Sequence, residues 1–329
     1  MVLAREAGIK NSDLDLAINR SASFLRWYVN KGAIPYGDHR PWPGHEDNGK
    51  CSMAAILFDL LGDRKAATFF AKMSVAAYDE RERGHTGNFF NILWAMPAVA
   101  RCGPHTTGTY WQEQAWYYDL ARGWDGSFRY QGSPVGEEEH GKYTRWDNTG
   151  TYLLAYALPL KSLYLTGKNT SVVRAFTASE TEDAIEAGRD FFSTRSGLSG
   201  REMDRYRYEH RSVEELLAGL SSWSPAVRKR SAQELGRRDG DFMPILMNLL
   251  KSSNLDSRYG VVEALGNLTS KKDEAARVSI LSDSLQADDL WLRILAAEAL
   301  AGIGAPAKIA IPNMLKRFAM RDSKNDPRG

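Results

Sequence analysis

Cysteine, net charge and long apolar runs are all scarce in this chain of 329 residues. Its two cysteines, Cys51 and Cys102, lie inside apolar stretches, so we expect buried thiols and neither a disulfide framework nor a cysteine-based zinc site. The 43 basic residues are nearly balanced by 41 acidic ones, which gives a formal net charge of +2. Such a balance lacks the electrostatic footprint of a protein that binds nucleic acid or an anionic membrane.

Segments that direct a chain into or through a membrane are missing from the sequence as well. No apolar run approaches the ~20 residues that span a bilayer, and residues 1–10 lack the apolar core of a secretory signal. We therefore expect a soluble chain with no membrane partner. An amphipathic segment at 14–29 has almost nothing before it to pack against, so we expect a piece of a longer protein and leave its compartment open.

Helical periodicity is what the sequence does contain. Apolar residues make up 43% of the chain and recur every three to four positions, whereas sustained alternation of period two is nearly absent. This pattern predicts an all-α protein. The expected helices of the first part lie near residues 13–30, 47–61, 63–79, 87–101, 106–122, 147–165 and 180–194.

Three of these helices begin with similar polar residues. Asp47-Asn48-Gly49, His85-Thr86-Gly87-Asn88 and Asp147-Asn148-Thr149-Gly150 each precede a strongly apolar stretch. Helices that are apolar on nearly all sides are expected to be inner helices, with amphipathic partners covering them from outside. The alternation predicts an α/α-hairpin toroid, and because a closed ring of six hairpins needs more helices than this part offers, the ring is open like a horseshoe or truncated.

A different repeat occupies the last third of the chain. Segments 227–236, 257–266 and 292–301 align through an arginine, a pair of small or branched residues and a terminal leucine, and each is followed by a second expected helix. The aligned arginines, Arg228, Arg258 and Arg293, stand 30 and then 35 positions apart. Units of this kind bury their apolar faces only against neighbours, which predicts an α-solenoid. The segment resembles HEAT repeats.

The first part also carries a resemblance. It is similar to the helical toroids of terpene cyclases, prenyltransferase β-subunits and polysaccharide-processing enzymes. The segments 85–91 and 123–128 resemble an uncharacterised bacterial family that joins such a toroid to HEAT-like repeats, and this resemblance implies no particular activity. We accordingly expect a toroid-like domain at 1–200, a linker at 201–222, HEAT-like repeats at 223–320 and a polar tail at 321–329.

The polar helix starts are the candidate site. Inner helices of a toroid point their amino ends, with their free N–H groups and positive dipole ends, toward one rim. Asp47 and Asp147 are the expected acid and base of a glycan-cleaving reaction, and His85 is an expected proton carrier. The alternative is simple helix capping, because Asp, Asn and Thr are preferred at helix starts for structural reasons.

Around these residues we expect a substrate-binding surface. A glycine- and aromatic-rich loop at 123–146 is long enough to cover the rim, and tryptophans offer flat faces for sugar rings. The expected substrate-binding residues are Asn48, Asn88, Asn91, Trp94, Trp124, Asp125, Trp146 and Asn148. The His and acidic residues crowded at 38–47 fit no zinc signature, so no metal and no cofactor is expected.

Three functions remain open on the sequence alone. The first is a carbohydrate-related protein, a glycan hydrolase or lyase if it is an enzyme, that binds an oligosaccharide or another polar small molecule. The second is a non-catalytic scaffold that binds a protein partner through its HEAT-like repeats. The third, an isoprenoid-binding toroid, is weakened because the sequence has no Asp-x-x-Asp-Asp run.

Overall fold

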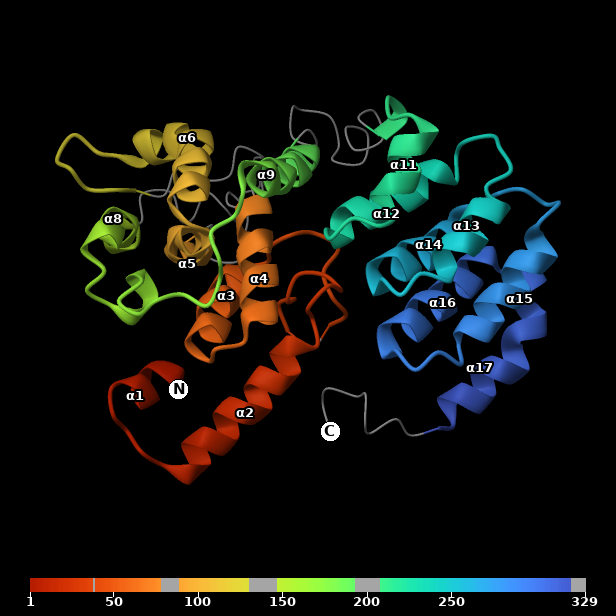
Figure 1. Ribbon diagram of the computed structural model, residues 1–329, viewed down its shortest axis with the longest axis horizontal. Coiled ribbons are helices and arrows are strands. Elements are labelled where there is room, and N and C mark those ends of the chain that lie inside the picture. The colour runs from red at the N-terminus through yellow and green to blue at the C-terminus, as the bar shows by residue number, and fades with distance from the viewer. Residues whose placement is uncertain (38, 78–88, 130–146, 193–207, 321–329) are drawn as a thin grey trace. The chain divides into compact units, whose positions relative to one another are not determined.

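The computed structural model describes residues 1–37, 39–77, 89–129, 147–192 and 208–320. The chain divides into two compact units, Met1–Gly197 and Leu198–Gly329, which are taken one at a time below. Throughout the described ranges the regular elements are helices (Figure 1). Pairing of the β type is limited there to isolated bridges, such as that between Ala33 and Trp42. The all-α prediction is confirmed.

In the N-terminal unit the helices follow the predicted segments closely. Some of them begin at capping side chains: Asn11 accepts the N–H groups of Asp13 and Leu14, and Asp63 accepts that of Ala66. The helices are α1 (Val2–Glu6), α2 (Ser12–Arg26), α3 (Lys50–Leu60), α4 (Arg64–Ala76), α5 (Phe89–Val99), α6 (Pro104–Ala121), α8 (Thr149–Tyr156) and α9 (Ala178–Phe192).

These helices form two layers. The apolar helices α3, α5 and α8 pack in sequence against one another, while α9 packs against both α4 and α6 in a second layer (Figure 1). Helices α3 and α5 bury residues around most of their circumference, but α4 buries nine residues as well, so the division into inner and outer helices stays a prediction. Closure of the layers into a toroid stays a prediction.

One predicted helix is shorter than expected. The apolar segment 147–165 was predicted as a single helix, but α8 ends at Tyr156, and 3₁₀ turns follow at Leu158–Leu160 and Tyr164–Thr166. Pro159 explains the break, because proline has no N–H to continue the helical ladder and clashes with the preceding turn. Lys161 then reverses the chain in a left-handed conformation, with φ 48°.

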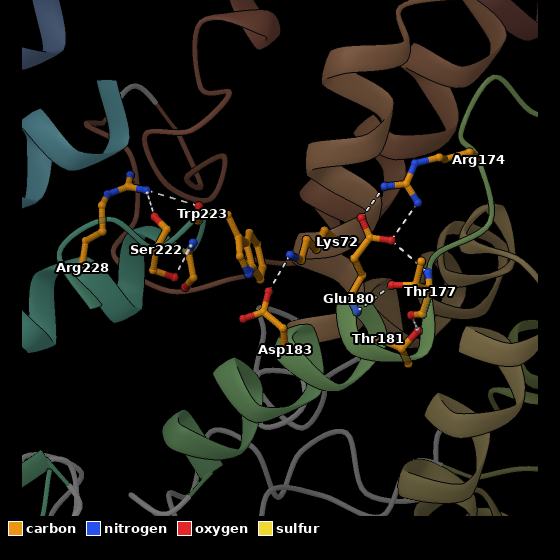
Figure 2. A network of polar contacts seen from close by, with 10 residues as sticks. Lys72, Arg174, Thr177, Glu180, Thr181, Asp183, Ser222, Trp223 and Arg228 are labelled. Carbon is orange, nitrogen blue, oxygen red and sulfur yellow. Dashed lines mark hydrogen bonds and ion pairs between the residues drawn. The ribbon is translucent and has the colours of Figure 1, made fainter. Parts of the chain in front are cut away.

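The outer helix α9 is fixed by polar contacts at its first turns (Figure 2). Thr177 and Glu180 form a capping box, with each side chain accepting the backbone N–H of the other at 3.2 and 2.9 Å. Arg174 binds the Glu180 carboxylate and, together with these bonds, lowers the pKa of Glu180 to about 2. An ion pair of 2.7 Å between Lys72 and Asp183 joins α9 to α4.

The C-terminal unit is a stack of helix pairs. Its first helices, α12, α14 and α16, pack side by side, while α13 packs against α14, α15 packs against α14 and α16, and α17 lies beside the 3₁₀ turn that precedes it. Helix α11 falls inside the range 201–222 that was expected to be a linker. The helices are α11 (Val213–Gly219), α12 (Pro225–Leu235), α13 (Met243–Leu250), α14 (Leu255–Asn267), α15 (Glu274–Ser284), α16 (Leu290–Ile303) and α17 (Ile311–Phe318), with a 3₁₀ turn at Ala305–Ala310.

The aligned arginines occupy one structural position. Arg228, Arg258 and Arg293 each stand four residues after a capping residue. Arg228 and Arg293 are buried, and each donates to the two carbonyl groups five and six residues earlier, at 2.7 to 3.2 Å (Figure 2). Arg228 also reaches Asp256 at 3.2 Å. In the first and third repeats the recurrent arginine therefore closes the turn before its helix.

The aligned glycines have a packing role. A Cβ on Gly236 would lie 2.3 Å from the carbonyl oxygen of Asn267, and one on Gly266 would lie 2.7 Å from the Cβ of Ala299. Each glycine thus lets its helix approach the next repeat closely. The third repeat has Ala301 at this position, where the side chain is exposed.

A partly buried carboxyl makes the stability of this unit depend on pH. Burial raises the pKa of Glu263 to about 7, helped by nearby Glu298 and opposed by Arg228 and Lys229. Because the folded state then binds more protons than the unfolded one between about pH 4.5 and 7, stability falls as pH rises through this window. In the parent chain the free energy of unfolding should fall by about 1–3 kcal/mol across this pH window because of Glu263. We expect Glu263→Gln to abolish that fall.

The measurement is the free energy of unfolding in urea between pH 5 and 8. The exposed carboxyl of Asp283 provides the control, since Asp283→Asn should keep the slope of the parent chain. An unchanged slope in Glu263→Gln would contradict the assignment.

Candidate functional site

The start of α3 lies beside the first turns of α5. Gly49 has a left-handed φ of 73°, and a Cβ there would lie 2.3 Å from the carbonyl oxygen of Phe90 and 3.2 Å from the ring of Trp94. Only glycine meets both conditions comfortably. The start of α3 therefore contacts the first turns of α5, and a rim shared by all three polar helix starts stays a prediction.

Glu46 holds the start of α3 in place. Its side chain is 2% exposed and accepts four hydrogen bonds, from the N–H groups of Asp47, Cys51 and Ser52 at 2.9 Å each and from the Ser52 hydroxyl at 2.7 Å. The Ser52 hydroxyl lies 2.8 Å from that of Ser74 on α4. Because every bond serves the backbone or the core, Glu46 is a capping residue set one turn before the helix.

Asp47, one of the two predicted catalytic carboxylates, lies just before α3 and is partly exposed. Its Oδ2 lies 3.5 Å from Lys50 Nζ, and the same ammonium group donates to the Asp47 carbonyl at 3.1 Å. Lys50 also lies 4.8 Å from the centre of the Tyr36 ring. The carboxylate is thus neutralised on one side and available to hydroxyl donors on the other.

Three predicted binding residues gather at the same corner. Asn48 adopts a left-handed φ of 56°, and its buried Oδ1 has no hydrogen-bond partner within the described ranges. Asn91, 1% exposed, lies in the first turns of α5, and Trp94 lies next to Gly49. The structure therefore places Asn48 and Trp94 on either side of the Gly49 contact, with Asn91 on the same helix as Trp94.

A pocket of about 830 Å³ opens beside Asp47. The backbone pairing of Ala33 with Trp42, at 2.8 and 2.9 Å, folds the preceding loop back on itself and sets one wall. The Tyr36 and Trp42 rings are 57% and 50% exposed. The described lining residues are Pro35, Tyr36, His39, Arg40, Pro41, Trp42, Pro43 and Asp47.

Sequence reasoning found only part of this pocket. Among the described lining residues, Asp47 is the one that belongs to the predicted site residues, and Tyr36, His39, Arg40 and Trp42 were not predicted as binding residues. The signal that could have located them is the density of proline around two aromatics, because proline fixes φ and so holds exposed rings in place.

Asp147 occupies a different setting. Its Oδ1 accepts the Thr149 N–H at 2.9 Å, and bonding to Thr149 holds the pKa of Asp147 below its ordinary value. It is exposed, and among the described residues it is absent from the lining of the Asp47 pocket. The bond to Thr149 is that of a helix-capping carboxylate, and the pairing of Asp47 with Asp147 stays a prediction.

The loop before α8 places three further predicted residues. Asp125 accepts the N–H and hydroxyl of Ser127 at 3.0 and 2.6 Å in a tight turn, and Trp124 at its tip is 99% exposed. Asn148 is 2% exposed at the start of α8. None of the three lines the Asp47 pocket within the described ranges. His85, Asn88 and Trp146, with the rest of the expected cover loop at 130–146, lie outside the described residues.

A second candidate surface lies on the last repeat of the C-terminal unit. Helix α17 has no buried residue, and large apolar side chains are exposed on it and beside it. The exposed fractions run from 47% at Ile311 to 92% at Phe318. The exposed apolar residues are Ile309, Ile311, Leu315, Phe318 and Met320.

Comparison with known families assigns both parts of the chain. A family described as a domain of unknown function, DUF6288, matches residues 1–167. The chain belongs to the DUF6288 family. A family of HEAT repeats matches residues 213–301, so the DUF6288 segment is followed by a helical scaffold of HEAT repeats, and the match begins at α11.

Neither the search of curated proteins nor the search of solved structures found a match. The resemblance to an uncharacterised family with HEAT-like repeats is confirmed, whereas its bacterial origin and the toroid stay predictions. Across the residues that the structure describes, every helix of this DUF6288 protein is too short or too polar to cross a bilayer.

Proposed function

We propose that this chain is a non-catalytic interaction module whose HEAT repeats bind a protein partner. One observation carries the proposal: the last repeat exposes five large apolar side chains on and beside α17. Contiguous exposed apolar surface commonly marks a protein-binding site. Arrays of HEAT repeats use their extended surfaces in this way.

The test compares the proteins that co-purify with the full chain and with a variant of α17. Leu315→Gln combined with Phe318→Gln should lose at least one protein that co-purifies with the parent chain, because both side chains are 63% or more exposed. The control is Leu160→Gln, which changes an equally exposed apolar residue of the N-terminal unit. Identical sets of co-purified proteins, measured by quantitative mass spectrometry, would refute the proposal.

A second candidate function rests on the Asp47 pocket. We propose that it binds a short neutral oligosaccharide, because exposed aromatic faces stack on sugar rings while a carboxylate accepts their hydroxyl groups. Tyr36, Trp42 and Asp47 supply these groups. This candidate concerns binding, and glycan cleavage or isoprenoid binding gains no support from the described geometry.

Thermal shift over a panel of neutral oligosaccharides tests the second candidate. A ligand that binds only the folded protein adds about 2.7 kcal/mol to the free energy of unfolding when its concentration is 100 times its Kd. The added stability raises Tm. At least one oligosaccharide should raise Tm in the parent chain but not in Trp42→Ala. Trp124→Ala is the matched control, being a fully exposed tryptophan elsewhere. Equal shifts in parent and Trp42→Ala, or no shift with any sugar, would remove this candidate.

A further inference from the structure

The last helix pair of the HEAT repeats forms an apolar groove of about 580 Å³. Its floor comes from both helices, with Leu290, Ile294 and Ala297 on α16 and Ile311, Leu315 and Phe318 on α17. Along α17 the apolar residues recur at helical spacing, so they share one side of the helix. The surface is an open, shallow groove lined by side chains of both helices.

The shape of this groove fits a helix. Two packed helices leave a furrow into which the side chains of a third helix interdigitate, at interaxial distances of about 8–10 Å. Helix α17 spans eight residues, or about two turns, which matches the spacing of anchors at positions i, i+3 or i+4, and i+7 of an amphipathic helix.

The charged side chains that line the groove are both basic, Arg293 and Arg317. Residues 299–320 contain no Asp or Glu, but they include Lys308, Lys316 and Arg317. Arg317 lines the groove itself. Arg293, which also lines it, donates to two carbonyl groups at 2.7 and 2.9 Å. A partner that surrounds its apolar face with carboxylates therefore meets only complementary charge along this segment.

From shape and charge together we infer that the groove between α16 and α17 binds an amphipathic helix whose apolar face is flanked by acidic residues. The inference rests on the proposed function and names the chemistry of the partner. A second copy of the same groove is a poor occupant because two positive rims would repel. The tail at 321–329 is poor too, since it holds no large apolar residue.

Selection from a displayed library of helical peptides tests this inference. The library fixes Leu at positions i, i+3, i+4 and i+7 and allows Glu, Gln or Lys at the flanking positions. The full chain should enrich peptides rich in Glu, and the Leu315→Gln, Phe318→Gln chain should enrich none. Recovery of neutral or Lys-rich peptides, or of no binder at all, would overturn the inference.

The peptide that is selected then allows a charge-reversal experiment. Changing Lys316 and Arg317 to Glu should weaken its binding at least tenfold by fluorescence anisotropy, whereas Lys65→Glu, at an exposed lysine of α4, should change it less than twofold. Equal effects of the two variants would overturn the inference.

Two other occupants have their own readouts. Groove-dependent binding of vesicles that contain phosphatidylserine would assign the surface to lipid, and groove-dependent dimerisation in sedimentation would assign it to a second copy. Either result overturns the acidic helix. If a protein still co-purifies through Leu315 and Phe318 while no acidic peptide binds, the proposed function stands and this inference alone fails.

Discussion

Replacing Glu46 with alanine is expected to lower the free energy of unfolding of the N-terminal unit by about 3–5 kcal/mol, measured by chemical denaturation. The substitution removes the acceptor of four hydrogen bonds, three of them from backbone N–H groups at the start of α3. Two of these N–H groups belong to the buried residues Cys51 and Ser52 and would be left without an acceptor in the core. Unsatisfied buried donors account for most of the expected loss.

Two further variants separate this role from that of its neighbour. Asp47→Ala removes a partly exposed carboxylate and should lower stability by less than about 1 kcal/mol. Glu46→Gln keeps the side-chain shape and one acceptor oxygen, so its effect should fall between the two. Equal stabilities of Glu46→Ala and Asp47→Ala would show that Glu46 does not fix the start of α3.

Replacing Gly236 with alanine is expected to destabilise the HEAT repeats by about 1–3 kcal/mol. Its Cβ would lie 2.3 Å from a backbone oxygen of the next repeat, so α12 and α14 have to move apart. Gly302→Ala is the matched control, because a Cβ there meets nothing within 4 Å and alanine favours a helix over glycine. Thermal unfolding of the two variants should therefore shift in opposite directions, and a shared direction would contradict the packing role.

The helices and the HEAT repeats were predictable because their signals are local. Helical periodicity, capping residues such as Asp63 and Thr177, and the aligned arginines all lie within a few residues of the structure they specify. The early end of α8 was also local, since Pro159 stands in the segment, but the apolar pattern around it outweighed that signal in the prediction.

The site was less predictable because it depends on contacts between distant segments. The meeting of Gly49 with Phe90 joins positions that only the packing of α3 on α5 brings together. The pocket beside Asp47 depends on the backbone pairing of Ala33 with Trp42. The hydrophobic periodicity of the sequence does not predict this pairing. Capping and catalysis also favour the same residue types at helix starts, so Asp147 could be assigned to capping only from its bond to Thr149.

The exposed Ala301 has a consequence for engineering. The two earlier repeats present a bare backbone at this position, and the following repeat packs against it. A designer who extends the array by a fourth unit would place new backbone against the Ala301 methyl group, which holds the incoming helix too far away. Extension should therefore succeed only when Ala301→Gly is made together with the added unit.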